Sequence, residues 1–209
     1  FKYVIGWMVN EKNSRYFSIH VICNTIVSFL SISDVIRVYS QPVHESFLDA
    51  KTDTRACMII GALHLYHIIW YFNKLRIDDW VHHILSVGIA LPLSIFANSG
   101  SLVGHGLFYL SGLPGGIDYF LLFLNRNNLV KKITEKKINS YLNLWVRCPG
   151  CIIHTTLGLI GYNLYSRNDT DYYVAIISSL IVFWNGIYFM NQVVSNYAVE
   201  KYKLKLTKN

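Results

Sequence analysis

The chain has 209 residues, of which 53% are hydrophobic and 15% charged, and its formal net charge is +7 at neutral pH. Together with a mean hydropathy of +0.32, this composition argues against a soluble globular class. The positive charge is concentrated in a few loops, which is typical of membrane proteins and argues against a nucleic-acid partner.

Long stretches without Asp, Glu, Lys or Arg predict six membrane-spanning helices, because one pass needs roughly 20 mostly apolar residues. The first residue is Phe rather than Met, so we expect an N-terminal segment to precede it. The predicted fold class is all-α, a polytopic membrane helix bundle that forms one domain over residues 1–209. We expect the helices at about 16–36, 56–73, 80–97, 102–125, 148–166 and 172–198, with a polar turn at 98–101.

The distribution of Lys and Arg between alternate loops predicts the orientation of the bundle. Of the 19 Lys and Arg, all but four belong to loops on one side; the other side holds Arg37, Lys51, Arg55 and Arg167. Because cytoplasmic loops carry the excess, both termini are predicted to be cytosolic, in the endoplasmic reticulum or another internal membrane. The glycosylation acceptor sequence that begins at Asn168 falls on the lumenal side.

Two of the expected passes contain residues that disturb a helix. Pro92 lacks a backbone donor and crowds the carbonyl of Gly88, which predicts a kink. The sequence GLPGG at 112–116 predicts an interruption of the fourth helix near the middle of the membrane. Either small residues allow close helix packing there, or the irregular backbone lines a substrate cavity beside Asp118.

The segment between the fourth and fifth passes is amphipathic. Its polar residues occupy one helical face, and its apolar residues recur at helical spacing on the other. We expect a helix that lies in the cytosolic membrane interface. The apolar residues are Ile138, Tyr141, Leu142 and Trp145.

The sequence DDWVHH at 78–83 places four titratable residues at the start of the third helix. Asp78 and His82 are four residues apart, as are Asp79 and His83, so each carboxylate is predicted to lie beside an imidazole. A carboxylate that accepts from one ring nitrogen raises the basicity of the other, as a general base requires. In the alternative interpretation, these are interfacial polar groups, with the aspartates favoured by the helix dipole.

His64 and His67 lie three residues apart and therefore share one face of the second helix. Polar groups within a membrane helix usually face the bundle interior. Membrane di-iron enzymes use histidine-rich motifs, but such centres need many converging histidines, and we expect His20 and His44 on or near the other side. We therefore expect no metal.

Two further patterns have local explanations. Cys148 and Cys151 form a CxxC motif, typical of a redox pair or half a zinc site, but the chain has no second pair. The intervening Pro-Gly more simply marks the junction between the interfacial helix and the fifth pass. Asp34 and Arg37 are expected to form a local ion pair.

Residues 61–96, with Asp79 and the adjacent His82 and His83, resemble the TLC-domain family of polytopic membrane proteins. The family includes ceramide synthases, which transfer a fatty acyl group from acyl-CoA to the amine of a sphingoid base, and relatives without established catalysis that affect membrane lipids. Ceramide synthases carry further acidic residues on the next helix. Here His105 and Asp118 do not match that spacing.

The resemblance implies an acyl-CoA-dependent N-acyltransferase in which His82 or His83 removes the amine proton or accepts the acyl group, and Asp79 orients it. Acyl-CoA is then a co-substrate, and no other cofactor is expected. The alternatives are a non-catalytic lipid-binding or accessory subunit, with membrane lipids, other membrane subunits or a second copy as partners, and metal-dependent lipid oxidation. The expected substrate-binding residues are His64, His67, Lys74, Arg76, His105 and Asp118, with Lys74 and Arg76 attracting the CoA phosphates.

Overall fold

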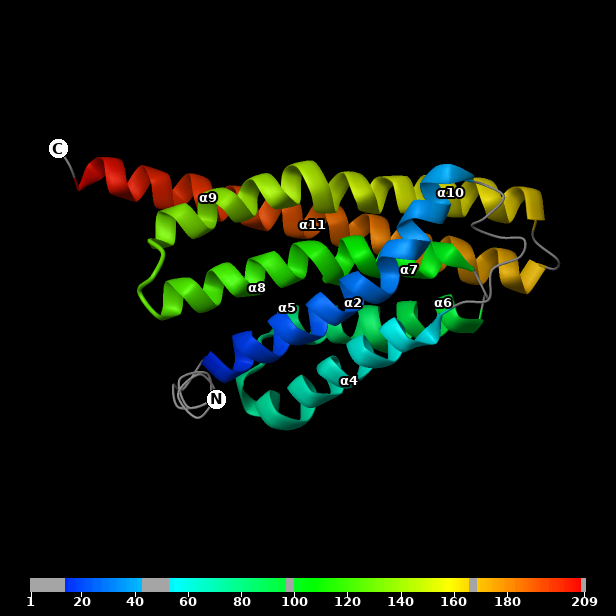
Figure 1. Cartoon of the computed structure of the whole chain (residues 1–209), viewed down its shortest axis with the longest axis horizontal. Coiled ribbons are helices and arrows are strands. Elements are labelled where there is room, and N and C mark those ends of the chain that lie inside the picture. Colours follow the sequence, from blue (N-terminus) through cyan, green and yellow to red (C-terminus); the bar gives the residue numbers. More distant parts are fainter. Residues whose placement is uncertain (1–13, 43–52, 97–99, 166–168, 208–209) are drawn as a thin grey trace.

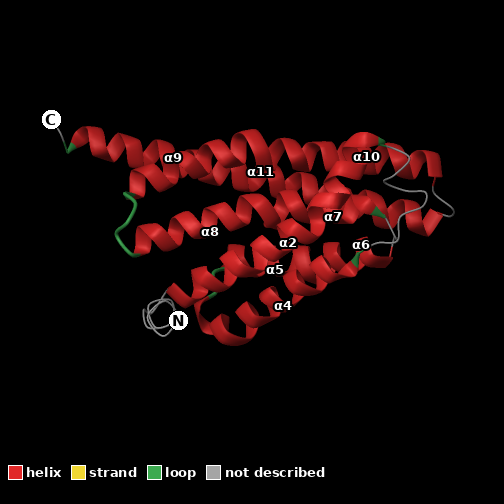
Figure 2. Ribbon diagram, viewed as in Figure 1, coloured by secondary structure: helices red, strands yellow, loops and turns green. Residues whose placement is uncertain are grey.

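The computed structural model describes residues 14–42, 53–96, 100–165 and 169–207, and this part of the chain is helical without any strand (Figures 1 and 2). The predicted all-α helix bundle is confirmed. Asn168, His44 and residues 98–99 of the expected turn lie outside the described residues. The elements are α2 (Ser14–Ser40), α4 (Thr54–Tyr71), η1 (Phe72–Lys74), α5 (Ile77–His83), η2 (Ile84–Ala90), α6 (Leu91–Phe96), α7 (Ser101–Leu107), η3 (Phe108–Gly112), α8 (Leu113–Arg126), α9 (Lys132–Leu142), η4 (Asn143–Arg147), α10 (Cys148–Tyr165) and α11 (Asp169–Leu206).

Five helical segments of the described chain are long and apolar enough to cross a membrane. They cover 15–40, 54–74, 77–96, 101–126 and 176–206, close to five of the six expected passes. The helix expected at 148–166 is α10, which is not among the five because polar residues such as His154, Thr155 and Asn163 lower its hydropathy. These helices make the chain a membrane protein.

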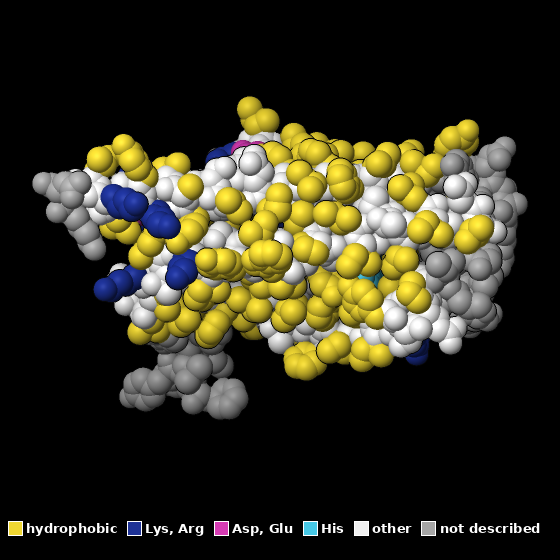
Figure 3. Space-filling view, turned by 90° about the horizontal axis from the view of Figure 1, so that it is seen from above, with side chains coloured by type: hydrophobic (Ala, Val, Ile, Leu, Met, Phe, Trp, Pro, Cys, Tyr) yellow, Lys and Arg dark blue, Asp and Glu magenta, His cyan; other side chains and the backbone are white. Residues whose placement is uncertain are grey.

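The distribution of side chains is that of a protein in lipid. Large apolar side chains point outward, and they cover most of the middle of the face in Figure 3. Polar side chains are buried instead, as expected where the alternative environment is hydrocarbon. Phe29, Ile69 and Trp145 are at least 70% exposed, whereas Asn24, His105 and Glu135 are at most 2% exposed.

The described chain begins and ends at the same end of the bundle (Figure 1). Several Lys and Arg side chains gather at the end of the visible face from which the C-terminal part of α11 projects (Figure 3). This arrangement agrees with an even number of passes. The cytosolic location of both termini stays a prediction.

The disturbed passes contain wide π-helical turns. In the third pass η2 precedes Pro92, so the crowding of the Gly88 carbonyl is accommodated by a wider turn. The prediction of an interrupted fourth helix is wrong, because α7, η3 and α8 follow one another without a break. Gly115 and Gly116 lie against Asn24 and Thr25 of α2, which is close packing on small residues, and Gly115 also lines a pocket together with Asp118, as the cavity alternative expects.

The segment expected at the membrane interface forms α9, and η4 joins it to α10 in one continuous rod (Figure 1). Its polar face is buried and its apolar face is exposed, which is the reverse of a helix on a water-soluble protein and is expected in contact with lipid. Glu135 and Asn139 are buried, whereas Tyr141 and Trp145 are more than half exposed. No break occurs at the predicted Pro-Gly junction. The interfacial location of α9 stays a prediction.

Small residues let α10 and α11 approach closely. A Cβ atom at Gly186 would lie 2.7 Å from that of Cys151, and one at Gly158 would overlap the Ser179 hydroxyl. The thiols of Cys148 and Cys151 are buried and free, so the CxxC motif serves packing in this structure. The expected contact between Asp34 and Arg37 is present, with 3.9 Å between Oδ1 and Nη1.

Replacement of Gly150 tests this packing. A Cβ atom there would overlap the Tyr109 ring, so we expect Gly150→Ala to destabilise the fold by about 1–3 kcal/mol, the usual cost of overpacking. Gly88→Ala is the matched control, because nothing lies within 4 Å of its Cβ position. Thermal unfolding in detergent measures both, and equal midpoints would contradict the close approach of α10 to η3.

Candidate functional site

A pocket of about 680 Å³, here called the central pocket, lies between the helices. Along α5, η2 and α6 its lining passes from Asp79 through His82 to Ser86 and Leu91. The end near the α4–α5 connection is charged, with Lys74, Arg76, Asp78 and Asp79 in its wall. The opposite end has apolar walls at Leu91, Leu102, Val103 and Leu107, with the polar His154 and Ser179 among them.

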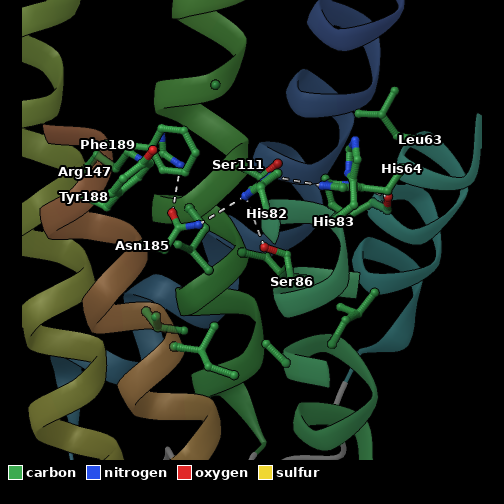
Figure 4. Close-up of a pocket in the computed structure, with 18 of the residues that line it drawn as sticks. Leu63, His64, His82, His83, Ser86, Ser111, Arg147, Asn185, Tyr188 and Phe189 are labelled. Carbon is green, nitrogen blue, oxygen red and sulfur yellow. Dashed lines mark hydrogen bonds between the residues drawn. The ribbon is translucent and has the colours of Figure 1, made fainter. Parts of the chain in front are cut away.

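Six histidines of the described chain line the central pocket: His20, His64, His67, His82, His83 and His154. The four from α4 and α5, namely His64, His67, His82 and His83, are here called the histidine cluster. The antiparallel neighbours α4 and α5 supply two each. His64 Nδ1 lies 2.9 Å from the Ile60 carbonyl oxygen, so this nitrogen carries the proton and donates it, while His64 Nε2 lies 3.4 Å from His82 Nε2 (Figure 4). One ring nitrogen each of His64, His82 and His83 lies within 4.8 Å of the other two.

A chain of polar contacts fixes His82 from its other side (Figure 4). Arg147 Nη2 donates to Asn185 Oδ1 at 3.0 Å, and Asn185 Nδ2 lies 3.5 Å from His82 Nδ1. Because a guanidinium only donates, Asn185 must turn its oxygen toward Arg147 and its N–H toward His82. His82 then accepts at Nδ1 and carries its proton on Nε2, facing the acceptor nitrogen of His64. The Arg147 guanidinium also lies over the Phe189 ring, 4.8 Å from its centroid.

His20 lies beside the histidine cluster, so its predicted position on the other side is wrong. The ring of His20 stacks on His67 with centroids 4.3 Å apart and on Tyr119 with centroids 3.7 Å apart. The reason is that α2 begins at Ser14, which places His20 at the same end of the bundle as the start of α5. His67 Nε2 and His83 Nδ1 are buried without a hydrogen-bond partner within the described chain.

In the described chain no hydrogen bond or ion pair joins Asp78 to His82 or Asp79 to His83, although the Asp79 charge is close enough to act on His83; both carboxylates contact Arg76 instead. The backbone N–H of Arg76 donates to Asp79 Oδ2 at 3.0 Å, and its Nη2 lies 3.1 Å from Asp78 Oδ2. Arg76 is the N-cap of α5, so Asp79 satisfies an otherwise unpaired donor at the helix start. The hydrogen bond to Asp79 is the main cause that raises the pKa of Arg76.

Asp118 lies in the wall of the central pocket, as expected, and is held by α9. Asn139 donates its side-chain N–H to Asp118, and Asn143 donates to Asn139 Oδ1 at 2.7 Å. Burial raises the pKa of the nearby Glu135, whose Oε2 lies 3.5 Å from Lys136 Nζ. A polar network from α9 therefore stands behind one wall of the pocket.

His105 does not line the central pocket, although the sequence predicts substrate binding for it. Its ring is fully buried among Tyr39, Tyr109 and His154, with centroids 4.9–5.9 Å away. The position on α7 turns it toward α2 and α10 rather than toward α5. The structure thus brings His64, His67, Lys74, Arg76, Asp79, His82, His83 and Asp118 to one pocket and leaves His105 out.

Asn185 and Arg147 are functional candidates that the sequence patterns did not single out. The only signal for Asn185 is a polar residue inside an apolar stretch, which usually faces the bundle interior. Arg147 stands at the end of a basic loop segment and counts there as an ordinary cytosolic charge. Its burial against Asn185 and Phe189 becomes visible only in the structure.

Comparisons with protein-family models, with curated proteins and with solved structures found no match to this chain.

The partners of His82 can be tested by NMR of ¹⁵N-labelled histidine. Asn185→Ala removes the N–H group beside Nδ1, so we expect it to shift the ring nitrogen resonances of His82. Asp79→Ala should leave these resonances unchanged and instead cost about 1 kcal/mol through the lost cap of α5. The opposite pattern would restore the pairing between the aspartates and the histidines.

Proposed function

We propose that this chain is a TLC-like membrane protein that holds an acyl lipid in the central pocket and transfers an acyl group from acyl-CoA to a lipid amine. The observation that carries the proposal is the histidine cluster, which lies between a charged pocket end that contains Lys74 and an end with apolar walls at Leu91, Leu102 and Leu107. This order of surfaces complements acyl-CoA, with phosphates at one end, a thioester in the middle and a hydrocarbon chain at the other.

Cationic side chains at the charged end of the pocket supply the electrostatic part of the complementarity to acyl-CoA. Lys74 and Arg76 lie in the pocket wall at the connection between α4 and α5. A guanidinium or ammonium there attracts the CoA phosphates without entering the membrane core. Arg76 is already paired with Asp78 and Asp79, so Lys74 is the better candidate for a phosphate contact.

The histidine cluster supplies the proton-transfer part. In N-acyl transfer a nitrogen–carbon bond forms, the carbon–sulfur bond of the thioester breaks, and the amine proton passes to the leaving thiolate. An imidazole with an unused lone pair can carry that proton. His67 and His83 each have a buried ring nitrogen without a partner in the described chain, which fits this task.

The expected role of Asp79, to orient a catalytic histidine, needs revision. Asp79 is engaged with Arg76, so we assign it to the start of α5 rather than to a histidine. Asn185 and Ser86 take over the positioning of His82. Asp118 lies in the same wall and, when ionised, can attract the ammonium form of the amine substrate.

Substitution of the cluster tests the catalytic proposal. We expect purified protein to form an amide from acyl-CoA and a long-chain amine, and His67→Asn or His83→Asn to lower kcat by roughly 10²- to 10⁴-fold, the usual contribution of a general acid or base. His105→Asn is the matched control, because this buried histidine lies outside the pocket lining. Bound lipid with no turnover in the unsubstituted protein would favour the non-catalytic alternative.

The proposed contact between Lys74 and the CoA phosphates gives a separate kinetic prediction. Lys74→Ala should raise KM for acyl-CoA about 2- to 10-fold with little change in kcat, because it removes binding energy that is equal in the ground and transition states. The effect should shrink at high salt. Lys205→Ala is the control, since Lys205 is exposed near the C-terminal end of α11. A loss confined to kcat would contradict a phosphate contact.

A further inference from the structure

We propose that His64, His82 and His83 hold a divalent transition-metal ion, with Zn²⁺ as the best match, whose open coordination position faces the central pocket. These three side chains come from two neighbouring helices. Their available ring nitrogens lie within 4.8 Å of one another. The metal site stands on this geometry alone; the role of the ion in acyl transfer rests on the proposed function.

The closest pair of nitrogens already has the spacing of two ligands. In a tetrahedral site with zinc–nitrogen bonds of about 2.0–2.1 Å, neighbouring ligand nitrogens lie roughly 3.3–3.4 Å apart. The separation between His64 Nε2 and His82 Nε2 is 3.4 Å. An ion between these rings therefore needs no movement of α4 relative to α5, and only the third ligand must close in.

The outer nitrogens of the same two rings are held as metal ligands require. A ligating histidine normally donates its second N–H to a neighbouring oxygen, which fixes its orientation. His64 Nδ1 donates to the Ile60 carbonyl oxygen at 2.9 Å. Ser86 Oγ lies 3.3 Å from His82 Nδ1 and can accept a hydrogen bond from an N–H group at that position. Metal loading then moves the His82 proton from Nε2 to Nδ1, and the 3.5 Å contact with Asn185 gives way.

His83 supplies an independent observation that points to a ligand. Its side chain is only 6% exposed, and its Nδ1 atom has no hydrogen-bond partner in the described chain. Leaving a buried polar atom unpaired costs about 1–3 kcal/mol. The residue therefore holds coordinating capacity that the protein itself does not use.

The donor set selects the class of ion. Three imidazoles without a carboxylate favour Zn²⁺ and similar borderline metals over Mg²⁺ or Ca²⁺, which prefer oxygen ligands. Three protein ligands also leave a fourth position open, as in catalytic zinc sites. The positive charge of Arg147 disfavours the ion, and the Asp118 carboxylate in the same pocket opposes this repulsion, whereas the charge of Asp79 is already paired with Arg76.

In the proposed reaction the open position receives the acyl carbonyl oxygen, which the ion polarises. With three histidines bound to the ion, His67 is the member of the cluster left to accept the amine proton. Its ring centroid lies 6.2 Å from that of His64 and 5.8 Å from that of His83. The four histidines would thus divide into three ligands and one base.

Metal titration of the full chain, purified in detergent without a polyhistidine tag, tests the site. We expect the metal-free protein to bind one equivalent of Zn²⁺, and one equivalent of Co²⁺ to give the visible absorption of a tetrahedral ion. His82→Ala and His83→Ala should each weaken binding by roughly 100-fold or more, and Ser86→Ala by about 10- to 100-fold. His67→Ala and His105→Ala are the matched controls and should bind normally.

The wild-type cobalt spectrum and Ser86→Ala keep the test decisive if a histidine variant fails to fold. Substoichiometric binding, an octahedral spectrum, or equal affinity in all variants would overturn the metal site. The two proposals also fail separately. Stoichiometric zinc without amide formation would overturn the acyl-transfer function and leave the metal site. Full turnover by protein from which a chelator has removed the zinc would overturn the role of the ion in acyl transfer and leave the acyl-transfer function itself.

Discussion

Polar groups inside this bundle have to satisfy one another, because the surrounding lipid offers no hydrogen bonds. The longest described example runs from Arg147 through Asn185 and His82 to His64 and ends on the carbonyl oxygen of Ile60. It ties η4, α11, α5 and α4 together. The Arg147 guanidinium at one end can only donate hydrogen bonds, and the Ile60 carbonyl at the other can only accept. These two ends therefore determine which group donates and which accepts in each hydrogen bond between them.

The same constraint explains why the pocket is where it is. Helices that meet on small residues pack closely, as Gly158 and Gly186 show between α10 and α11. Helices that bury histidine, asparagine and arginine leave room around groups with fixed directions. The pocket therefore follows the polar faces of α4, α5 and α11. The same buried polar side chains provide its reactive groups and leave its space unfilled.

Much of the fold could be predicted from the sequence, because lipid imposes a simple rule on charge. Charge-free stretches predicted the helix ends to within four residues, except that α11 continues to Leu206, eight residues beyond its expected end. The spacing of His64 and His67 placed them on one face toward His82. The partners of the histidines could not be predicted. Asp79 had two competing uses, beside His83 or at the start of α5, and only the backbone position of Arg76 decides between them. Arg147 looked like a loop charge until the rod formed by α9, η4 and α10 carried it inward.

The wide turns η2 and η3 affect which side chains of one helix can line the same wall of the central pocket. On an α-helix, side chains four residues apart rotate away from each other by about 40° at every step, so a run such as His82, Ser86, Ala90 and Ser94 would wind about a third of the way around the rod. All four nevertheless line the pocket, and η2 lies within the run. The series Leu107, Ser111, Gly115 and Tyr119 does the same across η3. The wide turns η2 and η3 offset this rotation, so residues four apart stay on the pocket wall along these two passes.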